Sequence, residues 1–134
     1  MQARQPAVML YVLDHGEYLN DFGEGFYDHG NRNHLTRFEI EVPFVPTFDD
    51  GFREGHAPEI ARMVERTRLG VSHDNVSHTL LGLMGIFDAS FRPESDLASA
   101  RFAEGQRSVF DGANKITRLE SVQFTRTRFV NNAR

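Results

Sequence analysis

The chain has 134 residues, of which 40% are hydrophobic and 25% are charged, a composition typical of one globular domain. The net charge of −4 argues against nonspecific electrostatic binding to nucleic acid. The absence of cysteine excludes disulfides, thiolate metal sites and a cysteine nucleophile. No apolar run reaches the roughly 18 residues that a membrane-spanning helix needs. We therefore expect a soluble protein, cytoplasmic or particle-associated, without a signal peptide or transmembrane segment.

The first expected element is a strand. Seven consecutive apolar residues, 7–13, lie between Pro6 and the turn-forming triplet 14–16. A short apolar run between turn residues is typical of a strand that is buried on both faces. Residues 14–34 follow with four glycines, three asparagines and no helical or strand period. Long irregular loops are usually functional or mobile, so this loop is expected to hold a site or to reach a neighbouring molecule.

A second strand is predicted over residues 36–44, because apolar and polar side chains alternate there. Pro43 and Pro46 lack the amide hydrogen that a central strand needs, so an edge strand or its end is expected. Helical periodicity begins at residue 57, where Pro58 is typical of a first helical turn. Gly70 can end this helix.

Another helix is predicted from an N-cap at Ser72 to Phe87. The glycines in that segment leave a strand over residues 79–87 as an open alternative. A third helix is predicted to begin at Pro93, and alternation near the C-terminus predicts a strand within residues 116–130.

These elements favour an α+β fold in a single domain over residues 1–134. The expected architecture is a small, mostly antiparallel sheet covered by two or three helices. An all-β sandwich is the alternative, and it would require residues 79–87 to form a strand.

The charge and phenylalanine distributions favour self-association. Residues 1–56 hold ten acids and four arginines, whereas residues 57–134 hold eleven basic and nine acidic residues. Opposite charges at the two ends favour head-to-tail contact between copies. Twelve phenylalanines exceed what a small core absorbs, so some rings are expected to meet a partner. The predicted interface residues are Phe22, Phe26, Phe48, Phe52, Arg126 and Arg128.

No convergent catalytic motif is present, whether a metalloprotease helix, a nucleophile elbow or a phosphate-binding loop. We therefore expect a non-enzymatic, self-associating structural or assembly subunit, such as a small virion- or sheath-type component. Its expected partners are copies of itself, with no cofactor and no membrane contact. Arg118, Arg126 and Arg128 could contact nucleic acid, but the acidic surroundings argue against it.

The alternative is a small histidine- and carboxylate-based metal-dependent enzyme or ligand-binding domain. His15, His29 and His34 share the 14–34 loop with several carboxylates, and these side chains are ligands for Zn, Fe or Mn. The same residue types are also common in polar surface turns. The candidate metal ligands are Asp28, His29 and His34, with a divalent metal as the cofactor.

Overall fold

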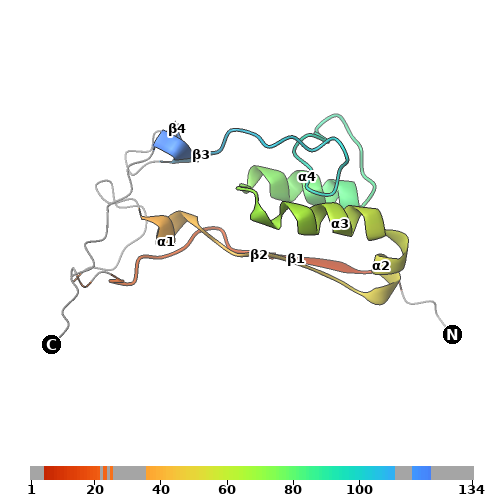
Figure 1. The fold of residues 1–134 in the computed structure, drawn as a ribbon, viewed down its shortest axis with the longest axis horizontal. Coiled ribbons are helices and arrows are strands. Elements are labelled where there is room, and N and C mark those ends of the chain that lie inside the picture. Colours follow the sequence, from red (N-terminus) through yellow and green to blue (C-terminus); the bar gives the residue numbers. More distant parts are fainter. Residues whose placement is uncertain (1–4, 22, 24, 26–35, 111–115, 122–134) are drawn as a thin grey trace. The chain divides into compact units, whose positions relative to one another are not determined.

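The computed structural model describes residues 5–21, 23, 25, 36–110 and 116–121 (Figure 1). The chain divides into two compact units, one made of residues 1–11 and 44–107 and the other of residues 12–43 and 108–134. Across the described residues, every helix is too short or too polar to cross a membrane. The prediction of a single domain over 1–134 stays a prediction.

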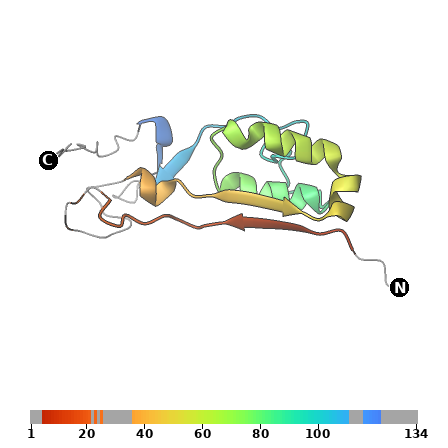
Figure 2. The same ribbon diagram turned by 60° about the horizontal axis from the view of Figure 1, so that its bottom comes forward.

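The first unit is built on a two-stranded sheet of β1 (Val8–Val12) and β2 (Phe44–Phe48). The two strands run in opposite directions (Figure 2). Burial alternates along both strands, so that Val8, Leu10, Phe44 and Phe48 pack against the core. The predicted strand at 7–13 is therefore confirmed as β1, but within the described residues the core covers one of its faces and not both, as had been expected.

Helices cover that one face of the sheet. The helices α2 (Asp50–Gly55), α3 (Ala57–Glu65) and α4 (Asp74–Leu83) follow β2 in order, with the 3₁₀ turn η1 (Arg66–Arg68) after α3. Both α3 and α4 lie on the same side of the strands (Figures 1 and 2). The core beneath them consists of Phe52, Met63, Leu83, Leu97 and Ala98.

Local sequence signals explain where these helices begin. Asp49 caps α2, because its carboxylate accepts the amide hydrogen of Phe52 at 2.8 Å. Pro58 stands in the first turn of α3, as predicted. The helix predicted after Ser72 is confirmed as α4, although it ends at Leu83 and not at Phe87, and the alternative strand over 79–87 is wrong.

The third helix predicted from Pro93 is wrong, because residues 93–101 form turns. The Asp96 carboxylate accepts the Ala98 amide at 2.7 Å, and arginines of α3 and η1 bind neighbouring carbonyls. Arg66 donates to the carbonyl oxygens of Leu97 and Ser99, both at 2.7 Å. Side chains thus form hydrogen bonds with backbone amides and carbonyls that a helix would pair with one another.

The second unit holds α1 (Arg37–Ile40), the antiparallel pair β3 (Ser108–Phe110) and β4 (Ile116–Arg118), and the 3₁₀ turn η2 (Leu119–Ser121). The strand predicted over 36–44 is wrong in its first part, where α1 forms, and β2 begins only at Phe44. Of the strand predicted within 116–130, the residues from 122 lie outside the described part.

The predicted α+β class is confirmed, and the all-β alternative is wrong. The described strands form two separate two-stranded sheets, so the expectation of one sheet is corrected.

Candidate functional site

The turn that follows β1 places Asp14 and His15 on an exposed surface of the second unit. Gly16 anchors this turn, because its amide donates to the Glu39 carbonyl of α1 at 2.8 Å. A Cβ atom on Gly16 would lie 1.8 Å from the Phe38 carbonyl oxygen. Only glycine allows this backbone approach, so the position of His15 depends on Gly16.

Helix α1, to which this turn is hydrogen-bonded, is itself stabilised by side-chain hydrogen bonds. The Glu39 carboxylate accepts the backbone amide of Thr36 at 2.7 Å and its hydroxyl at 2.8 Å. Both residues are buried. Tyr18, which is 1% exposed, lies 6.5 Å from Phe38 between ring centroids. The Asp14–His15 turn therefore stands on a packed, hydrogen-bonded base.

The His15 ring is oriented by its neighbours. Its Nδ1 lies 2.8 Å from the Gly16 carbonyl oxygen, and a carbonyl can only accept, so Nδ1 carries a proton. The Asp14 carboxylate accepts the His15 backbone amide at 3.0 Å and lies 3.9 Å from Nε2. The Gly16 hydrogen bond, and then the Asp14 charge, raise the pKa of His15 above its ordinary value of 6.5.

This arrangement supports two kinds of chemistry. A protonated His15 attracts anionic groups such as phosphates. In its neutral form, the ring with a proton on Nδ1 presents a lone pair on Nε2, which can accept a proton or bind a metal ion. An acid beside an oriented imidazole is an arrangement that general acid–base catalysis uses.

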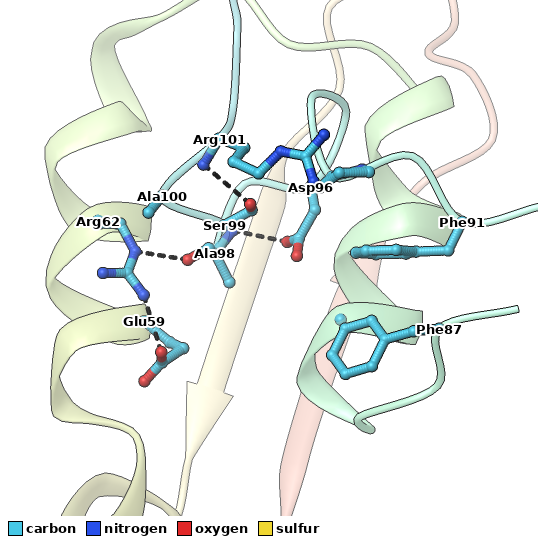
Figure 3. A pocket seen from close by; sticks show the side chains of 11 residues that line it. Glu59, Arg62, Phe87, Phe91, Asp96, Ala98, Ser99, Ala100 and Arg101 are labelled. Atoms are coloured by element: carbon cyan, nitrogen blue, oxygen red, sulfur yellow. Dashed lines mark hydrogen bonds and ion pairs between the residues drawn. The ribbon is translucent and has the colours of Figure 1, made fainter.

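A pocket of about 510 Å³ lies in the first unit, between α3, α4 and the turns that follow them (Figure 3). Phe87 and Phe91 form one wall, with ring centroids 5.0 Å apart in an edge-to-face arrangement. On the other side, Arg62 donates to the Ala98 carbonyl at 2.6 Å and to Glu59 at 2.8 Å.

Asp96 lines the same pocket and is 3% exposed. Burial raises the pKa of this carboxyl, although the amides of Ala98 and Ser99 and the nearby arginines act in the opposite direction. A Cβ on Gly82 of α4 would come within 2.1 Å of an Asp96 carboxylate oxygen. The Asp96 carboxylate thus packs against Gly82, while Thr79 of α4 accepts the Leu97 amide at 3.0 Å and joins these turns to the helix.

The structure describes only some of the residues that were predicted to form an interface or to bind a metal ion. Phe52 is 5% exposed and stacks on Phe48, with centroids 5.6 Å apart, so these two rings pack in the core of their own chain. The remaining predicted residues lie outside the described part of the chain: Phe22, Phe26, Asp28, His29, His34, Arg126 and Arg128. Within the described residues, no group of three potential ligands is placed to hold a metal ion.

Sequence reasoning counted Asp14 and His15 only as members of a histidine-bearing loop. The sharper signal was their position directly after an apolar strand and directly before a glycine. Binding and catalytic residues are often found in the segments that follow strands, so this position could have indicated a site.

The chain is similar to parts of known proteins. The chain is 31% identical over 99 residues, 71% of its length, to the phosphoethanolamine transferase EptA of Helicobacter pylori. Its fold resembles the crystal structure of the C-terminal periplasmic domain of EcEptC from Escherichia coli, with a TM-score of 0.70 and 20% identity over 86% of this chain. The chain spans 18% of the EptA sequence and 32% of the EcEptC chain. No protein-family model matches.

These findings correct the functional expectations drawn from the sequence. The prediction of a non-enzymatic structural or assembly subunit of virion or sheath type is wrong, because the similar protein is a transferase. The predicted cytoplasmic or particle-associated location is also wrong, because the structural neighbour is a periplasmic domain. Association with copies of itself stays a prediction.

Proposed function

We propose that this chain forms part of a periplasmic enzyme domain that transfers phosphoethanolamine groups, with the Asp14–His15 turn in its reaction centre. The observation that carries the proposal is the 31% identity with EptA over 99 residues. The fold likeness to the EcEptC domain supports the same architecture and the same compartment.

The chemistry of the Asp14–His15 turn suits this reaction. Transfer of the group moves phosphorus from one oxygen to another, and the negative charge on the phosphoryl oxygens must be stabilised. Protonated His15 can supply positive charge, and neutral His15 can take the proton of an attacking hydroxyl. Asp14, which lies 3.9 Å from Nε2, stabilises the protonated ring.

The chain spans about a fifth of EptA and about a third of the EcEptC chain.

The test is a transfer assay on the protein isolated from its native source. Vesicles of phosphatidylethanolamine serve as the donor. In the expected reaction, the bond between phosphorus and the glycerol oxygen breaks, and a bond from phosphorus to the acceptor oxygen forms. The acceptor's proton passes to the glycerol oxygen, so diacylglycerol is released and can be quantified by mass spectrometry.

Substitution of His15 identifies the centre. We expect His15→Ala to lower the rate of diacylglycerol release by about 10²–10⁴-fold, the usual contribution of an acid–base residue. His73, an exposed histidine of the first unit, provides the matched control, and His73→Ala should leave the rate unchanged. Wild-type protein that releases no diacylglycerol would contradict the proposed activity, and a fully active His15→Ala variant would contradict the assigned centre.

A further inference from the structure

The pocket between α3, α4 and the turns that follow them has the size and the composition of a small-molecule site. Its volume of about 510 Å³ lies within the range of about 300–1,000 Å³ that is usual for ligand pockets. Its 11 lining residues all belong to the first unit, so ligand binding here does not require the Asp14–His15 turn. They combine an aromatic wall with charged side chains of both signs (Figure 3).

The aromatic wall is held in place by contacts within the chain. The Phe91 ring makes edge contacts with Phe87 and with His78 of α4, at centroid distances of 5.0 Å and 6.4 Å. The turn between the two phenylalanines is fixed by the Asp88 carboxylate, which accepts the amide of Ser90 at 2.8 Å and its hydroxyl at 2.6 Å. Phe87 is nevertheless 70% exposed. The wall is therefore preformed and accessible, which lowers the entropic cost of binding an apolar group.

Asp96 contributes a buried negative charge that has no ion-pair partner. It is 3% exposed, and its carboxylate accepts the Ala98 amide at 2.7 Å. No cationic side chain in the described part of the chain forms an ion pair with it. Burial is the main influence on the pKa of this carboxyl and raises it, because the charged form is incompletely compensated. An ammonium group in the pocket would supply the missing positive charge.

Arg101 contributes an exposed positive charge to the same pocket. Its backbone amide donates to the Ser99 hydroxyl at 3.0 Å, but no described residue forms a hydrogen bond or an ion pair with its guanidinium. The guanidinium of Arg62, in contrast, is already bound to the Glu59 carboxylate and the Ala98 carbonyl. An unpaired guanidinium is a common binding group for carboxylates and phosphates. The pocket thus offers a ligand one carboxylate and one guanidinium.

We propose that this pocket binds a small zwitterion with an apolar substituent, namely a free amino acid with an aromatic side chain. Its ammonium group pairs with Asp96, its carboxylate pairs with Arg101, and its apolar group packs against Phe87 and Phe91. Each simpler ligand class leaves part of the site unmatched. An anion is repelled by Asp96, a cation is repelled by Arg101, and an uncharged apolar molecule desolvates both charges without compensation.

NMR titration of the full chain with L-phenylalanine tests this site without any activity measurement. We expect saturable shifts of the backbone amides of Phe91, Ala98 and Ser99, with a dissociation constant of about 1 mM or lower, and no shift at Val109 of β3. Phenethylamine lacks the carboxylate and hydrocinnamate lacks the ammonium, so each should bind at least about tenfold more weakly. Equal binding of either analogue, or a titration that has not reached half-saturation at about 1 mM, would overturn the proposal.

Two exposed side chains allow substitution without disturbing the core, whereas the buried Asp96 is tested through hydrocinnamate. Arg101→Ala should weaken L-phenylalanine binding at least about tenfold and leave phenethylamine binding unchanged. Arg68→Ala removes an exposed arginine outside the pocket and should change neither. Phe87→Ala should weaken binding about fivefold, whereas Phe110→Ala, which removes a ring that is 68% exposed in the second unit, should not. Wild-type affinity in either pocket variant would overturn the proposal.

Discussion

The amide of Gly16 donates a hydrogen bond of 2.8 Å to the carbonyl of Glu39, and this contact joins the turn after β1 to helix α1. The approach is so close that any side chain at residue 16 would overlap the neighbouring backbone. The position of the exposed Asp14–His15 pair therefore depends on Gly16, which has no side chain.

Gly16→Ala should destabilise the protein by about 1–3 kcal/mol, the usual cost of forcing an added methyl group into a packed site. The added Cβ would lie 1.8 Å from the Phe38 carbonyl oxygen, so the turn must move away from α1. Urea unfolding followed by circular dichroism measures the free energy. Gly55→Ala is the control, because nothing lies within 4 Å of its added Cβ, and its stability should change by less than about 0.5 kcal/mol. Equal effects at both positions would refute the close approach.

The His15 ring should titrate above 6.5, because the Gly16 carbonyl and the Asp14 carboxylate favour the protonated form and raise its pKa. The stabilising contribution of His15 is fully present below the unfolded-state pKa. It is lost as the pH rises through the higher pKa of the folded state. Proton NMR of the ring measures the midpoint, and Asp14→Asn should lower it. A midpoint at or below 6.5 in the wild-type protein would contradict the assigned contacts.

Gly82 and Asp96 should be energetically coupled. A Cβ on Gly82 would lie 2.1 Å from the Asp96 carboxylate, so Gly82→Ala should cost about 1–3 kcal/mol in the wild-type background. In the Asp96→Ala background the carboxylate is gone, and the cost of Gly82→Ala should largely disappear. Urea unfolding of the four proteins of this cycle gives the coupling free energy, which we expect to exceed about 0.5 kcal/mol. Strict additivity would show that the two residues do not meet.

The metal content of the protein tests the predicted metal ligands directly. If Asp28, His29 and His34 bind a divalent ion, the protein isolated from its native source should contain about one equivalent of Zn, Fe or Mn. His29→Ala and His34→Ala should each lose most of it, whereas His73→Ala should retain it. Elemental analysis by mass spectrometry provides the readout. Protein without metal, or with metal that survives both substitutions, would remove this prediction.

Where the sequence predicted an element correctly, its local pattern and the tertiary contacts favour the same structure. Pro58 in a first helical turn predicted α3, and the helical spacing of apolar residues predicted α4 despite Gly82. The Gly82 position that weakens helical propensity is the one that receives the Asp96 carboxylate. A packing requirement thus explains a residue that looked unfavourable from propensity alone.

The elements that sequence reasoning missed are determined by individual hydrogen bonds. Alternation over 36–44 predicted a strand, but the Thr36–Glu39 capping interactions favour a short helix there. The predicted helix after Pro93 is replaced by turns, because Arg62 and Arg66 bind the carbonyls of residues 97–99. Such contacts join residues more than 30 positions apart, and local patterns carry no information about them.

The candidate site was only partly predictable for the same reason. The sequence identified the 14–34 loop as the place to look, and Asp14 and His15 lie there. It did not single them out, because the contact between Gly16 and Glu39 joins segments 23 residues apart. The proposed function rests on the comparison with EptA, because the sequence analysis found no local motif for that reaction.

The measurement that tests the central claim most directly is the release of diacylglycerol from phosphatidylethanolamine vesicles by the natively isolated protein and by its His15→Ala variant. The account predicts release by the wild-type protein and a loss of about 10²–10⁴-fold in the variant. A wild-type protein that leaves the vesicles intact, while its circular dichroism shows it folded, would contradict the proposal that this chain belongs to a phosphoethanolamine-transferring enzyme.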